Sequence, residues 1–164
     1  MADSSPFATP VDAAYDSRIL LFGRLMGAAN GLEYLLARDL EESTGLTHPI
    51  FELLLIVARR GDEGVSVKDI AQAKVVTSGG ATRLVSRGVA QGLVTLHPSD
   101  ADGRVKLVRL SEHGTEKLLE ASAIHARNIE RYLLDALPRG SEKSFAASVR
   151  ALSKSASAAL PAMP

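Results

Sequence analysis

Residues 77–91 carry hydroxyl and guanidinium groups at spacings that place them on one side of a helix. At 100° per residue, the apolar side of such a helix would hold Ala81, Leu84, Val85, Gly88 and Val89. The opposite side would hold Ser78, Gly79, Thr82, Arg83, Ser86, Arg87 and Ala90. Hydroxyl and guanidinium groups bind phosphate oxygens and base edges. The segment therefore predicts a helix whose outer face reads a nucleic acid.

A preceding helix and a following hairpin would position this face. Ser66, with Asp69 three residues later, is a capping-box-like start for a helix just before the segment. Residues 93–96 and 105–110 read as two short strands around a charged tip, 97–104. A helix-turn-helix places its second helix in the major groove of DNA. A hairpin directly after it is called a wing.

The wing adds three candidate residues, Asp102, Arg104 and Lys106. Arg104 is placed to reach the adjacent minor groove, and Asp102 can brace its guanidinium through a bidentate contact. Arg83 and Arg104 are the principal candidates, whereas Arg87 is expected to touch phosphate because base contacts concentrate near the helix N-terminus. The full set of candidate DNA-binding residues is Thr77, Ser78, Thr82, Arg83, Arg87, Asp102, Arg104 and Lys106.

Charge is divided unevenly along the chain, although the formal net charge is zero. Residues 71–110 hold six basic residues against two acidic ones, whereas residues 1–65 hold five arginines against ten acidic residues. With a Debye length of about 8 Å, distant acidic groups are largely screened from a phosphate backbone at the basic region. The alternative interpretation, a solvated surface of mixed charge, also fits the wing taken alone.

The composition restricts the other functions. A length of 164 residues fits one domain, and the absence of cysteine excludes disulfides, thiolate zinc sites and cysteine-based peroxide sensing. We expect no membrane segment, because no apolar run approaches the roughly 20 residues that span a bilayer. The first residues do not read as a secretory signal, so a cytoplasmic protein is expected.

Catalytic and metal-binding patterns are missing from the sequence. There is no G-x-S-x-G elbow, no P-loop and no G-x-G-x-x-G after a strand. The four histidines, at positions 48, 97, 113 and 125, include no pair at i and i+4. We therefore expect no enzyme activity, no cofactor and no metal.

Long apolar helices flank the nucleic-acid-binding segment. Thr9-Pro10 begins one that continues to about Gly45, a single helix of roughly 30 residues by its apolar spacing. Thr47 begins a second helix that is apolar nearly all round. After the wing, Ser111 begins a helix to about residue 137, and Ser141 begins the last one. The apolar faces of the end helices exceed what one core of this size can cover, which predicts a two-fold dimer.

The order of these elements resembles the MarR (multiple antibiotic resistance regulator) family over residues 46–119. In that family the recognition helix reads approximately S-x-S-T-V-T-R-L-V-D-R-L, followed by G-L-V and a wing that contains D-x-R. Here residues 77–88 read TSGGATRLVSRG, residues 92–94 read GLV, and residues 102–104 read DGR.

The resemblance implies a mainly α fold with a small β-hairpin wing (α+β), in which a winged helix-turn-helix core is flanked by N- and C-terminal dimerisation helices. Residues 1–8 would be a flexible N-terminus, 9–45 an N-terminal dimerisation helix, 46–110 the winged helix-turn-helix DNA-binding module, and 111–164 the C-terminal dimerisation helices.

The implied function is a homodimeric transcriptional regulator, in most relatives a repressor, on a palindromic operator in double-stranded DNA. A small anionic or phenolic effector would bind between the dimerisation helices and the winged module and relieve operator binding. Candidate effector-pocket residues are His48, Gly27, Tyr34 and His125, although His125 also fits a core histidine with satisfied hydrogen bonds. Gly23, Gly27 and Gly31 fit close helix packing, a pocket wall or no role.

Four residues depart from the family pattern. Gly79 and Gly80 stand where base-contacting side chains are common, and Leu96 and His97 stand just before the wing, where basic residues are common. They either remove DNA contacts or, for the glycines, let the backbone approach DNA closely. The second hypothesis is therefore a ligand-binding or protein-interaction dimer of the same fold with weak or lost DNA affinity.

Overall fold

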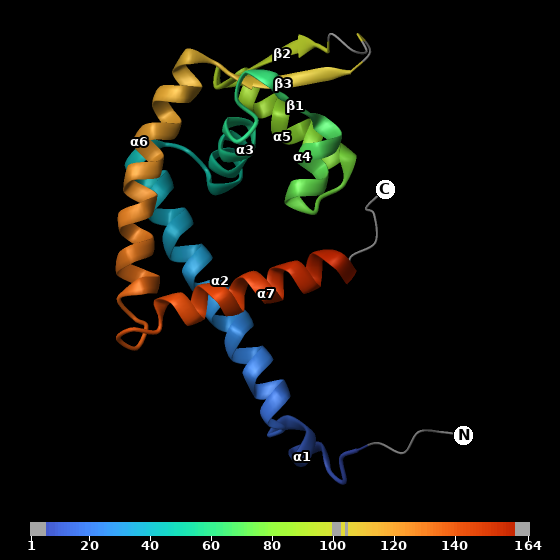
Figure 1. Cartoon of the computed structure of the whole chain (residues 1–164), viewed down its shortest axis with the longest axis vertical. Coiled ribbons are helices and arrows are strands. Elements are labelled where there is room, and N and C mark those ends of the chain that lie inside the picture. Colours follow the sequence, from blue (N-terminus) through green and yellow to red (C-terminus); the bar gives the residue numbers. More distant parts are fainter. Residues whose placement is uncertain (1–5, 100–102, 104, 160–164) are drawn as a thin grey trace, which may run out of the picture.

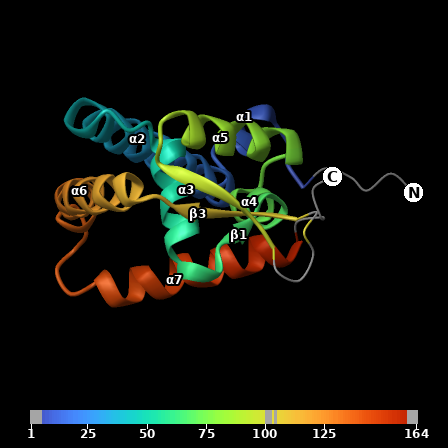
Figure 2. The same cartoon turned by 90° about the horizontal axis from the view of Figure 1, so that it is seen from above.

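The computed structural model describes residues 6–99, 103 and 105–159 of the chain. Its elements follow the order α1 (Pro10–Ala14), α2 (Ser17–Thr44), α3 (His48–Ala58), η1 (Gly61–Glu63), β1 (Val65–Ser66), α4 (Val67–Lys74), α5 (Ser78–Ala90), β2 (Val94–Pro98), β3 (Lys106–Leu110), α6 (Glu112–Ile129), η2 (Glu130–Leu134) and α7 (Glu142–Ala159). Elements α3 to β3 gather at one end, and α2 and α6 run away from them side by side (Figures 1 and 2). The expected mainly α fold with a β-hairpin wing is confirmed.

The sheet is larger than expected by one strand. Its antiparallel order is β1-β3-β2, and Val94 pairs with Leu110 at one end of the hairpin. Strand β1 has only two residues, too few to leave an alternating pattern in the sequence. Strand β2 extends to Pro98, so His97 and Pro98 belong to the strand and not, as expected, to the tip. In β3, Val108 is the residue that is fully buried.

Helix α3 is the centre of the core, as its apolar sequence indicated. Pro49 lies in its first turn, where the missing N–H costs nothing. The fully or almost fully buried side chains of this helix are Ile50, Phe51, Leu53, Leu54 and Val57. They pack against α5, α6 and β3, so this helix holds the winged module together and joins it to the end helices.

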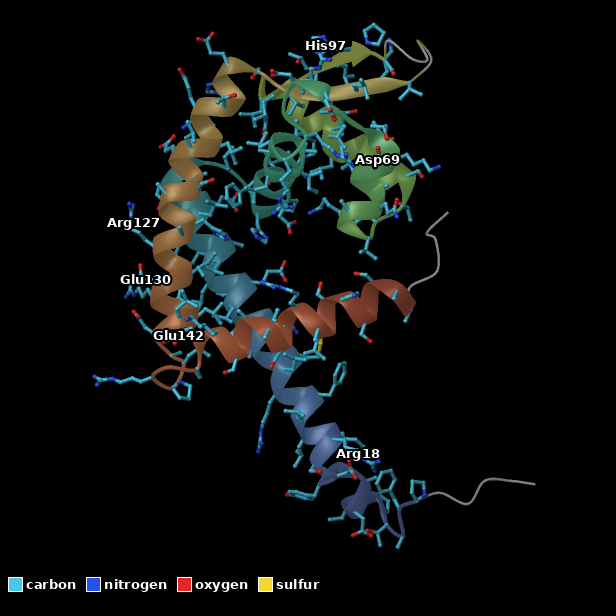
Figure 3. All side chains as sticks on the ribbon, in the orientation of Figure 1. Arg18, Asp69, His97, Arg127, Glu130 and Glu142 are labelled. Atoms are coloured by element: carbon cyan, nitrogen blue, oxygen red, sulfur yellow. The ribbon has the colours of Figure 1, made fainter. Side chains whose placement is uncertain are left out.

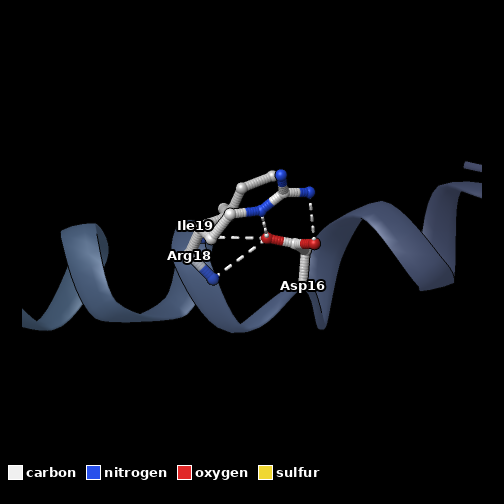
Figure 4. A network of polar contacts seen from close by, with 3 residues as sticks. All are labelled: Asp16, Arg18 and Ile19. Carbon is white, nitrogen blue, oxygen red and sulfur yellow. Dashed lines mark hydrogen bonds and ion pairs between the residues drawn. The ribbon is translucent and has the colours of Figure 1, made fainter. Parts of the chain in front are cut away.

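The expected single helix over 9–45 is wrong at its beginning. Thr9 does cap a helix, but α1 ends at Ala14, and Asp16 starts α2 by accepting hydrogen bonds from the N–H groups of Arg18 and Ile19 (Figure 4). Its carboxylate also accepts two bonds from the Arg18 guanidinium, which lower the pKa of Asp16 to about 2. A capping aspartate supplies a helix start that apolar spacing alone does not show.

The helix after the wing is not regular to residue 137, because a π turn, η2, follows α6. This turn carries Tyr132, whose hydroxyl donates a 2.6 Å hydrogen bond to Asp39 on α2. That bond and those from Arg38 lower the pKa of Asp39, and the contact with Asp39 raises the pKa of Tyr132. This bond ties the C-terminal part of α2 to the turn that follows α6.

Both ends of the chain leave apolar surface uncovered. Leu40 is the only buried residue of α2, and α7 has none. Helix α7 crosses the view of α2 in Figure 1 but lies apart from it in Figure 2. Large exposed side chains on the two helices include Leu21, Phe22, Leu25, Val149 and Leu152. A Cβ added at Gly23, Gly27 or Gly31 would meet nothing within 4 Å, so these glycines pack closely against none of the residues that the structure describes.

By length and composition alone, α2 could cross a membrane, since its most apolar window has a mean hydropathy of 1.2. Length and composition alone are weak evidence for a membrane span, because helices of soluble proteins can meet the same two criteria. The helix also carries charged residues and packs along α6. An exposed apolar face of this kind is equally what a helix presents to another helix in a protein interface.

Candidate nucleic-acid interface

Helix α5 has the amphipathic character predicted for residues 77–91. Thr77 is its N-cap, and the Thr77 Oγ1 accepts a 3.2 Å hydrogen bond from the N–H of Gly80. The buried face consists of Ala81, Leu84, Val85 and Gly88, whereas Val89 is 40% exposed. The opposite face is exposed at every position: Ser78, Gly79, Thr82, Arg83, Ser86, Arg87 and Ala90.

The hydroxyl groups of this face differ in what they can offer. Thr82 donates to the carbonyl of Ser78, and Ser86 donates to the carbonyl of Thr82, each at 2.9 Å. Their oxygens are thereby oriented as acceptors, which suits the amino groups of bases better than phosphate. Thr77 instead accepts its bond from the backbone, so its O–H can donate to a phosphate oxygen.

Arg83 and Arg87 project from the exposed side of α5, one turn apart. Among the described residues, neither guanidinium has an acidic side chain within ion-pair distance. Each therefore has its donors available for bidentate binding of phosphate or guanine.

The basic surface is smaller than the sequence count suggested. The Lys74 ammonium pairs with Glu52 of α3, and its side chain is only 12% exposed. Arg109 is partly buried, with its Nε enclosed and its side chain packed beside Gly64. Lys74 and Arg109 therefore contribute little to a DNA-binding surface.

The wing contributes Lys106, which is exposed at the start of β3. Asp102 and Arg104, the predicted brace and minor-groove contact, lie outside the described residues. Figure 3 shows His97 on β2, where its Nε2 lies 2.9 Å from the Thr95 hydroxyl. Leu96 is 47% exposed, so the wing presents an apolar side chain beside its polar ones.

A surface cavity of about 550 Å³ lies behind the recognition helix. Arg83 and Arg87 line one wall together with Gly80 and Leu84 of the same helix, and the remaining lining residues are Glu33, Pro49, Glu52, Lys74 and Val76. Its volume is within the range of small-molecule sites. The sequence did not identify Glu33, Glu52 or Lys74 as residues that line a cavity. Glu52 carried a usable signal, because it is the one acidic residue in the apolar helix α3.

The predicted effector-pocket residues come together only in part, and none lines this cavity. His48 and His125 face each other, with ring centroids 5.7 Å apart. Gly27 and Tyr34 are exposed on α2, Tyr34 to 68%. The expectation of a satisfied core histidine at 125 is wrong, since its Nδ1 is buried without a hydrogen-bond partner among the described residues. No group of three or more His, Asp or Glu side chains in the described part of the chain could hold a metal ion.

Two helices joined by a tight turn, the second presenting a polar and basic face, and a hairpin directly after them define a winged helix-turn-helix protein. Residues 44–105 match the family model of the MarR family. The resemblance that the sequence indicated is thus confirmed for this segment.

Solved structures of low sequence identity share the fold over most of the chain. Sco3205, a MarR family transcriptional regulator from Streptomyces coelicolor solved in complex with DNA, aligns with a TM-score of 0.77 and 22% identity over 93% of this chain and 92% of that one. A mutant MarR from E. coli complexed with operator DNA gives 0.72 and 20% over 82% and 95%. CouR from Rhodococcus jostii RHA1, bound to p-coumaroyl-CoA, gives 0.71 and 21% over 85% and 94%. No curated protein matches the sequence.

Proposed function

We propose that this protein is a homodimeric, DNA-binding transcriptional regulator that acts in the cytoplasm, as a repressor, on a palindromic operator. The observation that carries the proposal is the outer face of α5, where Arg83 and Arg87 stand exposed among hydroxyl groups and have no acidic partner among the described residues. The match of residues 44–105 to the MarR family supports the same function.

A dimer is supported by the apolar surfaces of α2 and α7, which one subunit leaves uncovered. A two-fold axis through these helices would present two copies of α5 on the same side. Reading of two half-sites requires a separation of about 34 to 36 Å, one helical turn of DNA. Pairing of the end helices would set that separation.

The cavity behind α5 supports an effector site for a small anion. Its cationic groups are Lys74, which is paired with Glu52, and Arg83 and Arg87, which are also the groups proposed to bind DNA. An anionic ligand there would compete with phosphate for the same guanidinium groups. A coupling of about 1 to 3 kcal/mol would change operator occupancy 5- to 150-fold. His48, Gly27, Tyr34 and His125 remain proposed contacts of a second region between the end helices and the winged module.

Fluorescence anisotropy on the DNA flanking the protein's own gene tests this function. We expect Arg83→Ala and Arg104→Ala to weaken binding at least tenfold and to lower the salt slope by about one each, as lost phosphate or base contacts do. Arg127→Ala is the matched control, because Arg127 is exposed on α6, away from α5 (Figure 3). Binding by Arg83→Ala as tight as that of the parent would exclude the proposed interface.

A second candidate function is a ligand-binding or protein-interaction dimer with weak DNA affinity. Leu96, which is exposed on the wing, favours this candidate. So do Lys74, which is paired with Glu52, and Arg109, which is partly buried, because both contribute little to the basic surface. In that case affinity for DNA would be low at 50 mM salt and nearly independent of sequence. A steep loss of a sequence-specific affinity with rising salt would exclude this candidate.

A further inference from the structure

Two imidazole rings meet where the winged module contacts the end helices. His48 lies in the first turn of α3, and His125 lies on α6. Their ring centroids are 5.7 Å apart at an interplanar angle of 34°, and Phe51 packs its ring at 60° to that of His125, 4.9 Å away. Neither histidine is exposed, so solvent reaches both rings only in part.

Few groups around His48 and His125 could balance a positive charge on either ring. The Nδ1 of His125 is enclosed and has no hydrogen-bond partner among the described residues. On α3, Glu52 acts on His125 from a distance, but its carboxylate is already paired with Lys74. On α2, Glu33 lies 4.0 Å from the Nδ1 of His48, at the outer edge of an ion pair, and its side chain is 68% exposed. One acidic group is thus committed elsewhere, and the other is screened by water.

We propose that His48 and His125 form an acid-sensitive joint, in which protonation weakens the packing of α3 against α6 and so loosens the winged module from the end helices. Two imidazolium ions at this spacing repel each other, and each loses hydration in a half-buried site. The joint needs no ligand, and it acts on the contact through which the recognition helix is oriented relative to the rest of the chain.

The direction of the pH dependence follows from His125, because burial disfavours its protonated form. Burial lowers the pKa of His125 below its ordinary value of 6.5, and the charge of His48 lowers it further. The unfolded chain therefore binds a proton more readily than the folded chain. The stability contributed by neutral His125 is fully present above pH 6.5 and is lost as the pH falls below that value toward the lower pKa of the folded state.

A titration of the full-length parent protein by NMR tests the joint directly. We expect the His125 ring signals to titrate below pH 6.5, because burial and then the neighbouring His48 lower the pKa of His125. The reference for this titration is the ordinary histidine pKa of 6.5, and His113, exposed in the first turn of α6, is the control position for substitution. Titration of His125 at or above pH 6.5 would overturn the proposal.

Urea unfolding at pH 7.5 and pH 5.5 gives the second measurement. The parent should lose stability on acidification, His125→Gln should lose less than half as much, and His113→Gln should lose as much as the parent. An equal loss in His125→Gln and the parent would refute the joint. Neither measurement uses DNA, so the joint and the proposed regulatory function can fail independently. With operator DNA, the His125→Gln protein should show a flatter change of affinity between the two pH values.

Discussion

Substitution of Gly114 by alanine tests how the wing is fixed to the end helices. Gly114 lies in the first turn of α6, and a Cβ built there would stand 1.9 Å from the carbonyl oxygen of Leu93. The same carbonyl accepts a 3.1 Å hydrogen bond from the N–H of Ser111, and the Ser111 hydroxyl donates a 2.6 Å bond to the carbonyl of Gly92. The start of α6 must therefore move away from the start of the wing in the alanine variant.

The size of the effect follows from the contacts that this movement breaks. Two hydrogen bonds of about 1 kcal/mol each are strained or lost. Overpacking of a close backbone contact costs a further 1 to 3 kcal/mol or so, and the gain in helix propensity is at most about 1 kcal/mol. We expect the free energy of unfolding of Gly114→Ala to fall by about 2 to 4 kcal/mol in total.

Urea unfolding followed by circular dichroism at one fixed protein concentration measures this difference. Gly79→Ala is the matched control: it is also a glycine in a helix, but a Cβ there meets nothing within 4 Å. The control should be more stable than the parent by up to about 1 kcal/mol. If both variants moved in the same direction, or Gly114→Ala were as stable as the parent, the close approach would not be what fixes the wing.

Three further substitutions have defined outcomes. Val75 ends α4 in the left-handed region, at φ 55° and ψ 47°, so Val75→Asn should raise the unfolding midpoint by relieving about 1 kcal/mol of strain, whereas Val75→Ile should not. Tyr132→Phe removes the largest cause that lowers the pKa of Asp39, so NMR titration should find that pKa closer to its ordinary value of 3.8. Glu52→Ala leaves the Lys74 ammonium without its partner in a site where it is 12% exposed, and thermal unfolding should show a loss of about 1 to 2 kcal/mol that Lys74→Met in the same chain largely recovers. An additive double variant would mean that the pair is not coupled.

The recognition helix could be predicted from the sequence because its signals are local. Thr77 as N-cap and the apolar spacing from Ala81 to Gly88 place the helix and its buried face without knowledge of the rest of the chain. Val89 lies in the last turn of α5 and is 40% exposed, so the buried face ends at Gly88 and not, as the spacing predicts, at Val89.

The cavity and the histidine pair could not be predicted, because they depend on contacts between distant segments. Glu52 and Lys74 are 22 residues apart, and whether a lysine faces DNA or an acidic partner is decided by how α3 and α4 pack. Likewise, a histidine on an apolar stripe of α6 reads as a core residue, whereas its missing partner at Nδ1 is visible only once α3 lies against it. The roles of Arg104 and Asp102 stay predictions.

Arg83 and Arg87 face outward on α5 and also line the cavity behind it. Under the proposed function, a genetic screen would recover two kinds of allele at the same two codons: alleles that no longer bind the operator and alleles that no longer respond to an inducer. Alleles that separate the two phenotypes should map to the opposite wall, at Pro49 or Glu33, where a change in shape or charge alters the cavity and leaves the surface of the recognition helix intact.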